Sequence, residues 1–181
     1  MTTTRHYTID DLAAIEEPGR YDLIRGELLK MPPAGGDHSE IGVNLIYLLW
    51  GHVRRDEVGR VYGPDAGFLL ARDPDVLLSP DAAFVRNDRL PPSGGRQGFL
   101  PLAPDVAVEI VAPSDRASAV DAKVAEYLRA GTQLVLVVQP ELRSIAVWTP
   151  DQRARVYREA DEIDFGDVLP GFRLRVSDVF A

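Results

Sequence analysis

Three side chains in this sequence are candidates for metal-dependent hydrolytic chemistry: Asp81, Glu109 and Lys123. Glu109 interrupts a nearly continuous apolar run at residues 106–111, where an ionised carboxylate is costly unless it is paired, protonated or bound to a cation. Strand alternation places Glu109 on the same face as Asp105, four residues earlier. The alternative is a glutamate at the edge of the core that forms an ion pair with an arginine.

Asp81 follows Pro80 at the mouth of an expected strand. A preceding proline favours an extended entry, so the carboxylate would lie where the strand begins. The Pro-Asp dipeptide occurs at four other places in the chain and is common in turns. The strand that follows is therefore what distinguishes Asp81 from the other aspartates.

Lys123 lies beside the apolar stripe of an expected helix, so its stem can lie along a sheet while its ammonium group reaches inward. Of the 20 basic residues, only Lys30 and Lys123 are lysine. A compact ammonium group can orient or deprotonate a water better than a forked, permanently charged guanidinium can. The alternative is a solvated helix residue paired with Glu126 or Asp121.

The composition limits which chemistry is open to the chain. Its 181 residues, 45% hydrophobic, are expected to form a single domain over residues 1–181. The absence of cysteine excludes disulfides, thiolate metal clusters and a cysteine nucleophile, leaving His, Asp and Glu as metal ligands. A formal net charge of -8 repels phosphate backbones, so any nucleic-acid role needs a local site.

Neither a secretory signal nor a membrane span is expected. Acidic residues come before any apolar run at the beginning of the sequence, unlike a signal peptide. The longest aliphatic run, residues 134–138, is far shorter than the roughly 18–20 residues that a spanning helix needs. We therefore expect a cytoplasmic protein without a membrane partner.

The first third of the chain predicts two helices with a β-hairpin between them. A capping box at Thr8 begins a short helix that ends at Pro18. Residues 21–31 alternate around a turn that contains glycine, as a two-residue hairpin does. Residues 41–54 carry apolar side chains at helical spacing, with Ser39 as the expected N-cap.

Short strands and a loop are expected next. Residues 61–62, 68–70 and 82–85 are extended segments separated by Gly-Pro and Asp-Pro. Residues 86–104 are rich in proline and glycine, which predicts a long surface loop.

The last third predicts a β-α-β unit followed by a second hairpin. Residues 106–111 and 134–138 are apolar runs typical of buried strands, and a helix that Gly131 ends lies between them. Such a crossover implies parallel pairing. Residues 145–157 form the hairpin, and residues 169–180 are expected to pack back on the core. The whole predicts an α/β (α+β) fold in which helices flank a central mixed β-sheet.

Taken together, five groups of sequence segments resemble motifs of the PD-(D/E)XK nuclease superfamily. They are most similar to its Uma-type putative restriction endonuclease branch. The segments are YDLIRGEL (21–28), SPDAAFV (79–85), APDVAVEIVAPSD (103–115), KVAEY (123–127) with AG (130–131), and LPGF (169–172). The resemblance implies a restriction-endonuclease-like core. It also places Asp81 at the metal-binding aspartate of the family and Glu109 at its second acid.

The sequence departs from the superfamily pattern at one point. The lysine expected two residues after the acid is absent, because Val111 stands there. In this branch the lysine has moved to the following helix, which makes Lys123 the matching residue. Asp81, Glu109 and the carbonyl of Ile110 would then hold Mg²⁺ or Mn²⁺, while Lys123 positions the attacking water. The resemblance implies products with a 5′-phosphate and a 3′-hydroxyl.

Other residues are secondary candidates. Glu27 matches an acid typical of the branch and is a possible third catalytic carboxylate, or else an exposed hairpin residue. His38 matches a position before the first long helix, where it could contact phosphate or metal or be structural. The candidates for contact with the substrate also include Tyr127 and a basic rim on the loops, Arg86, Arg89, Arg96 and Arg116.

Three functions are compatible with these residues. The first is a metal-dependent DNA endonuclease, expected to act as a homodimer because double-strand cutting by a small one-site nuclease needs two copies. The second is a nuclease fold that no longer cuts and serves as an interaction or regulatory module. The third is a phosphodiesterase acting on RNA or small nucleotides, which suits the acidic surface because a small substrate needs no extended basic groove.

Overall fold

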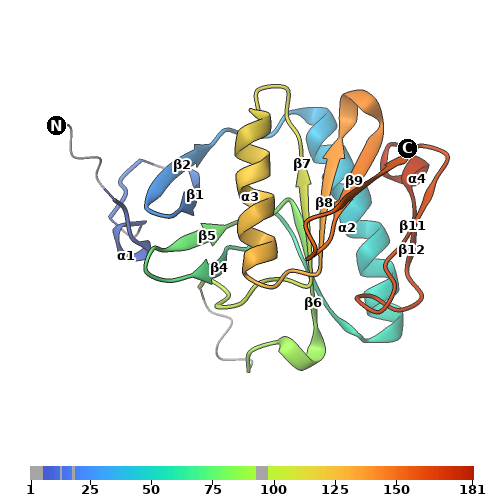
Figure 1. Ribbon diagram of the computed structural model, residues 1–181, viewed down its shortest axis with the longest axis horizontal. Helices are drawn as coiled ribbons and strands as arrows, with labels where there is room; N and C mark the ends of the chain where they lie inside the picture. The colour runs from blue at the N-terminus through green and yellow to red at the C-terminus, as the bar shows by residue number, and fades with distance from the viewer. Residues whose placement is uncertain (1–5, 13, 18, 93–97) are drawn as a thin grey trace.

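The computed structural model of the chain describes residues 6–12, 14–17, 19–92 and 98–181. Its strands are β1 (Arg20–Ile24), β2 (Glu27–Met31), β3 (Gly59–Tyr62), β4 (Phe68–Ala71), β5 (Val76–Leu78), β6 (Ala82–Arg86), β7 (Val106–Ile110), β8 (Leu134–Gln139), β9 (Ser144–Trp148), β10 (Ala154–Arg158), β11 (Glu162–Asp164) and β12 (Arg173–Arg175). A central sheet has the order β10-β9-β8-β7-β6-β3, and a second sheet has the order β2-β1-β5-β4 (Figure 1). β11 and β12 form a separate two-stranded ribbon.

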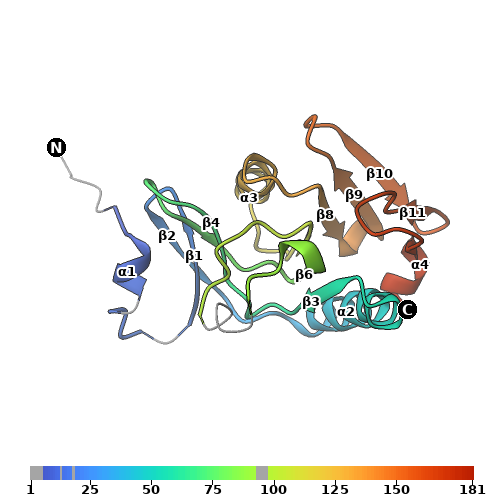
Figure 2. The same ribbon diagram turned by 90° about the horizontal axis from the view of Figure 1, so that it is seen from below.

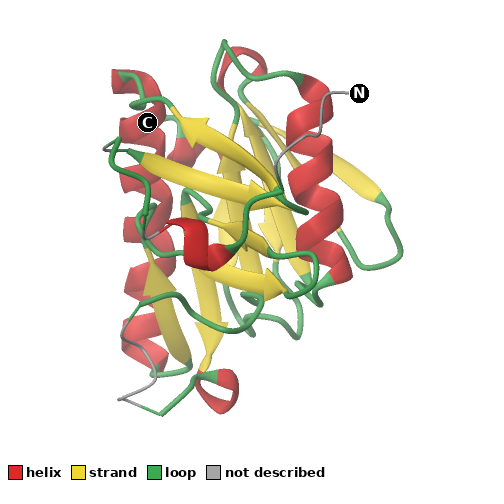
Figure 3. Cartoon of the chain, turned by 90° about the vertical axis from the view of Figure 1, so that its left-hand side faces the viewer, coloured by secondary structure: helices red, strands yellow, loops and turns green. Residues whose placement is uncertain are grey.

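Two long helices cover the central sheet on opposite faces (Figure 3). The helices are α1 (Ile9–Leu12), α2 (Gly36–Asp56), α3 (Ala117–Arg129) and α4 (Val176–Val179), with 3-10 turns at Asn87–Arg89 and Pro140–Leu142. α2 buries its apolar stripe in the larger core cluster, and α3 packs Val124 and Tyr127 against the other face. No helix in the described part of the chain is both long and apolar enough to cross a membrane.

The predicted β-α-β unit is confirmed. β7 and β8 pair in parallel, with Glu109 opposite Val137, while the other strand pairs are antiparallel. All five residues of β7 are buried, as its apolar run predicts. Central strands covered on both faces lose contact with water, so a carboxylate on β7 has only protein groups as partners.

The N-terminal hairpin is also confirmed, and an ion pair attaches it to α3. Arg25 and Gly26 at its turn have φ values of 51° and 86°, as a two-residue turn with two left-handed positions requires. The guanidinium of Arg25 lies 2.6 Å from the carboxylate of Glu126 on α3. The second sheet is therefore held beside the helix that carries Lys123.

The C-terminal end of the chain follows the prediction, whereas the N-terminal helix begins where predicted but ends early, at Leu12. Thr8 donates its backbone N–H to Asp11 Oδ2 at 2.7 Å, which is the expected cap of α1. β9 and β10 form the C-terminal hairpin, and Val176 and Val179 pack into the main core. The predicted end of the N-terminal helix at Pro18 is wrong, because the N–H groups of Ala14 and Ile15 donate to carbonyls three residues earlier, as in a turn, and residues 14–17 are not helical. Ala13 and Pro18 themselves lie outside the described residues.

The predicted N-cap of the long helix is wrong. α2 begins at Gly36 with Gly35 as its N-cap, because the chain is already helical when it reaches Ser39. The N–H of Ser39 donates to the carbonyl of Gly35 at 3.0 Å, so Ser39 is an interior residue of the first turn. The consequence is that His38 lies on the first turn of α2 rather than before it.

Three short strands were not predicted. β5, β11 and β12 have three residues each, which is too few for a periodic pattern. β5 is fully buried between β1 and β4, and its pairing with β1 joins segments distant in sequence. The predicted loop at 86–104 is shorter than expected, because β6 extends to Arg86 and a 3-10 turn follows.

Candidate active site

The main candidate residues meet where β7 ends and β6 begins. The N–H of Asp81 donates to the carbonyl of Val108 at 2.9 Å, which continues the pairing of β6 with β7. The N–H of Ile110 donates in turn to Asp81 Oδ2 at 2.7 Å. The carboxylate of Asp81 is therefore fixed at the end of β7, next to Glu109.

Glu109 is buried and uses both of its oxygens. Lys123 Nζ donates to Oε2 at 3.0 Å, and the hydroxyl of Tyr127 donates to Oε1 at 2.8 Å. Burial is the main reason that the pKa of Glu109 rises to about 7; the nearby carboxylates of Asp81 and Asp22 add to the rise, while Lys123 and Tyr127 oppose it. The cationic partner of Glu109 is a lysine, not the arginine of the alternative interpretation.

Lys123 is held between two acids. Its Nζ lies 3.0 Å from Glu109 Oε2 and 2.7 Å from Asp22 Oδ2. Burial by itself lowers the pKa of Lys123, but the carboxylates of Glu109 and Asp22 more than offset burial and raise it above its ordinary value. Lys123 therefore stays protonated and can orient a water or a phosphate oxygen, but it cannot act as a base.

The alternative partners of Lys123 are engaged elsewhere or exposed. Glu126 pairs with Arg25 and, at 2.7 Å, with Arg129. Asp121 is exposed on α3. Lys123 is thus a buried member of the acidic cluster and not a solvated helix residue.

Asp22 is the site residue that sequence reasoning missed. It lies on β1, is completely buried, and accepts a hydrogen bond from the N–H of Ser79 at 3.0 Å. The available signal was the same as for Glu109, an acid inside a short strand between apolar residues. The phrase YDLIRGEL contains Asp22, but nothing in one sequence says that the second sheet lies against α3.

His38 lies on the first turn of α2, with Nε2 3.4 Å from Asp81 Oδ2. A hydrogen bond with Asp81 is the main cause that raises the pKa of His38; burial opposes it, and the backbone of Ile110 and the carboxylate of Asp115 add to it. His38 is therefore beside Asp81, one of the three groups that the sequence analysis assigns to a metal.

Tyr127 cannot contact the substrate as predicted. It is completely buried, and its hydroxyl donates to Glu109. Burial and the neighbouring carboxylate of Glu109 raise the pKa of Tyr127 well above its usual value. Tyr127 therefore positions Glu109 and remains a neutral donor.

Two arginines of the predicted basic rim lie at the wrong edge of the sheet. β6 and β7 are antiparallel, so Arg86 at the end of β6 lies beside the start of β7, away from Asp81. The guanidinium of Arg86 pairs with Asp88 at 2.8 Å, and that of Arg89 pairs with Asp105 at 2.7 Å. Asp105 is on the same strand face as Glu109, but it lies at the start of β7, with Arg86 and Arg89 and away from the candidate site.

The remaining candidates have different positions. Arg116 is the exposed N-cap of α3, on the connection that leaves the end of β7. Glu27 is exposed at the start of β2, the edge strand of the second sheet, outside the buried cluster. Arg96 lies outside the described residues.

The donor set fits a hard divalent cation. Asp81, Glu109 and the Ile110 carbonyl offer only oxygen, and Mg²⁺ is typically held by one or two carboxylates together with water and substrate phosphate. Among the described residues, no group of three or more His, Asp or Glu side chains is arranged to hold a metal ion.

Comparison with solved structures finds the same fold in another protein. A crystal structure described as a putative nuclease belonging to DUF820 from Anabaena variabilis superposes with a TM-score of 0.84, covering 96% of this chain and 97% of the other, at 20% sequence identity. At that identity the likeness shows the fold. No functionally curated protein matches the chain.

Residues 8–177 match the Uma2 family, described as "Putative restriction endonuclease". The match covers nearly the whole sequence, and the chain belongs to this family. The predicted family and the predicted α/β fold with a central mixed sheet are both confirmed.

Proposed function

We propose that this protein is a metal-dependent endonuclease that hydrolyses phosphodiester bonds of DNA. Asp81, Glu109 and the carbonyl of Ile110 hold Mg²⁺ or Mn²⁺, and Lys123 completes the centre. The observation that carries the proposal is a buried Glu109, with a pKa of about 7, next to Asp81. Burying two neighbouring acids is costly, and a bound cation offsets that cost.

The side chains have distinct tasks in this reaction. A bound divalent cation neutralises charge on the phosphate and makes water a better nucleophile. Lys123, kept protonated by Glu109 and Asp22, donates hydrogen bonds that orient the attacking water in line with phosphorus. Tyr127 holds the carboxylate of Glu109 in place. The products are a 5′-phosphate and a 3′-hydroxyl.

His38 and Arg116 are the proposed phosphate contacts. His38 already lies 3.4 Å from the carboxylate of Asp81, and Arg116 is exposed at the N-terminus of α3. Helix N-termini favour anions, so both residues lie where a phosphate is stabilised. Glu27 has a weaker claim as a catalytic carboxylate, because it is exposed on an edge strand.

A phosphodiesterase acting on RNA or small nucleotides is the second candidate. The net charge of -8 favours it, as do the acidic partners that occupy Arg86 and Arg89. An inactive interaction module is less well supported, because such a module has no need for a lysine buried between two acids. We retain a homodimer in the proposal, since cutting both strands of a duplex needs two such centres.

Calorimetric titration of Mn²⁺ and Mg²⁺ tests the site directly. We expect saturable binding that Asp81→Asn and Glu109→Gln each abolish, while Glu27→Gln and Asp105→Asn retain it. Unchanged binding in both site variants would refute the metal assignment.

Cleavage assays on duplex DNA, single-stranded DNA, RNA and a dinucleotide then assign the substrate. We expect duplex DNA to be cut and Glu109→Gln to be inactive. Cleavage of RNA or the dinucleotide alone would establish the second candidate in place of the first.

A further inference from the structure

The outer face of α2 carries a stripe of exposed side chains that belong to none of the core clusters among the described residues. Val43, Tyr47 and Trp50 are 62%, 72% and 53% exposed, respectively. Spacings of four and three residues put them on one face of the helix, opposite the buried stripe of Ile41 and Leu45. Figure 2 shows α2 along the outside of the molecule. We call Val43, Tyr47 and Trp50 the α2 stripe.

The α2 stripe ends in opposite charges. Glu40 precedes it and Arg54 follows it, each seven residues from Tyr47. Seven residues are close to two helical turns, so both charges lie on the face of Tyr47, each about 10 Å from it along the axis. Both are exposed, and neither forms an ion pair with any residue that the structure describes.

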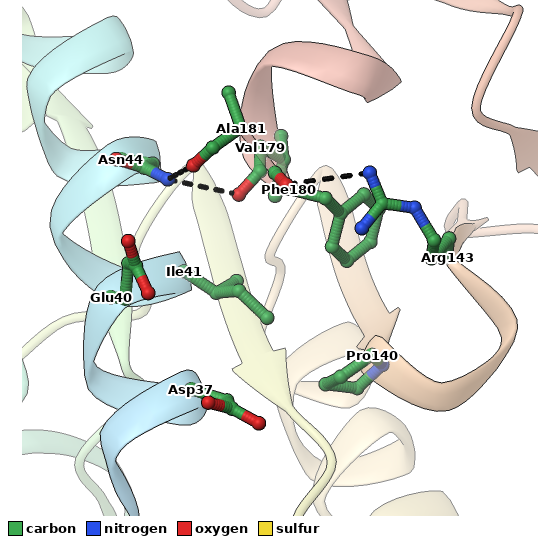
Figure 4. A pocket seen from close by; sticks show the side chains of 9 residues that line it. All are labelled: Asp37, Glu40, Ile41, Asn44, Pro140, Arg143, Val179, Phe180 and Ala181. Carbon is green, nitrogen blue, oxygen red and sulfur yellow. Dashed lines mark hydrogen bonds between the residues drawn. The ribbon is translucent and has the colours of Figure 1, made fainter.

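The borders of the α2 stripe are defined on both sides. On one side, Asn44 donates hydrogen bonds to the carbonyls of Val179 and Ala181 at 3.2 Å, which ties the C-terminal segment to α2 (Figure 4). On the other side, a groove of about 430 Å³ runs between the end of α2 and β3, with Trp50 and Arg60 on its walls. The exposed apolar surface is therefore a bounded ridge with room beside it for a side chain from a partner.

We infer that the α2 stripe is the surface through which two copies of this protein associate, with their α2 helices antiparallel about a two-fold axis at Tyr47. In that arrangement, Glu40 of each copy faces Arg54 of the other. A two-fold interface must be complementary to itself, and a helix face with opposite charges equidistant from an apolar centre meets this condition. A parallel arrangement would bring like charges together.

The size of the α2 stripe determines how strongly two copies should associate. A helix face of this length provides less than the roughly 800 Å² per partner that stable dimers commonly bury. The exposed aromatic residues are the kind that carry binding energy in interfaces. We therefore expect a concentration-dependent dimer. The inference rests on the homodimer of the proposed function and locates its interface, but it does not depend on the metal site.

Sedimentation equilibrium on the full chain, from micromolar to near-millimolar protein, tests this inference. Glu40→Arg and Arg54→Glu should each weaken dimerisation about tenfold, because each turns two attractive pairs into repulsive ones. The double variant, with both charges exchanged, should regain most of the affinity. An equimolar mixture of the two single variants should form a heterodimer.

The apolar part of the α2 stripe is tested separately. Trp50→Ser should abolish dimerisation, whereas Val156→Ser, at a similarly exposed position of β10, should leave it unchanged.

Several outcomes would overturn the inference. One is a monomer at every concentration, including a monomer whose α2 stripe binds nucleic acid or another protein instead. Another is a dimer that neither charge reversal affects, which would place the interface elsewhere. A double variant no better than the single variants would exclude the antiparallel pairing. Because the readout is mass, a failed nuclease assay does not affect the result.

Discussion

Lys123 on α3 and Glu109 on β7 form a buried ion pair of 3.0 Å, although the PD-(D/E)XK superfamily pattern expects the lysine two residues after the acid. Val111 occupies that position. The helix crosses the same face of the sheet, so a long side chain from α3 reaches the carboxylate from the side. Asp22 supports this arrangement from the second sheet, 2.7 Å from the same ammonium group.

Replacing Asp22 by asparagine should impair catalysis more than metal binding. The variant keeps the shape of the side chain but removes one of the two charges that hold Lys123, so the ammonium group loses its fixed orientation. We expect a decrease in kcat of about 10–100-fold with nearly normal Mn²⁺ affinity. Asp105→Asn, a buried acid at the other end of β7, is the matched control. Full activity of Asp22→Asn would show that Asp22 has no positioning role.

Replacing Lys123 by arginine should also reduce activity, although the charge is kept. The guanidinium is larger and forked, and it cannot place a single donor between Glu109 and Asp22. We expect at least about a tenfold loss of kcat, measured as single-turnover cleavage. Lys30→Arg, which changes the other lysine of the chain, should have no effect. An active Lys123→Arg enzyme would eliminate the proposed role in orienting water.

Stability should depend on pH through Glu109. Its pKa is about 7 in the folded protein, against an ordinary value of 4.5. Below pH 4.5 the carboxyl group of Glu109 is protonated in both the folded and the unfolded protein, so it does not lower the free energy of unfolding. As pH rises from 4.5 to 7 the unfolded chain loses the proton first, so folded stability falls through this window and then levels off.

Glu109→Gln should remove that pH dependence. In EDTA, its free energy of unfolding relative to the wild type should rise between pH 5 and pH 8 by roughly 2–3 kcal/mol. Urea titrations at the two pH values measure the difference. The control is Glu27→Gln, at an exposed position. An equal effect of Glu109→Gln at both pH values would contradict the raised pKa.

Gly59 should tolerate no side chain. A Cβ built there would lie 2.3 Å from the carbonyl oxygen of Val85 and 2.5 Å from the ring of Phe84. We expect Gly59→Ala to destabilise the protein by roughly 1–3 kcal/mol. Gly63→Ala provides the comparison, because its nearest neighbour, Ile46 Cδ1, is at an ordinary 3.7 Å. Equal melting temperatures of the two variants would disprove the predicted clash.

Local patterns predicted the elements that local interactions determine. The turn at Arg25 and Gly26, the buried run of β7 and the helical spacing in α2 and α3 all follow from residue type and periodicity. Ser39 was taken as a cap because its side chain suits one, but the backbone of Gly35 already accepts the hydrogen bond that begins the helix. β5 was missed because its strand conformation depends on neighbours supplied by β1 and β4.

An acid inside an apolar strand has few compatible environments, so residue types alone predicted a buried Glu109, and the family resemblance grouped Asp81 and Lys123 with it. Which further groups complete the cluster depends on tertiary packing. Asp22 joins through the packing of the second sheet, while Arg86 is carried to the opposite edge by the antiparallel direction of β6. Strand direction and sheet packing arise from contacts between distant segments, which spacing along one chain does not encode.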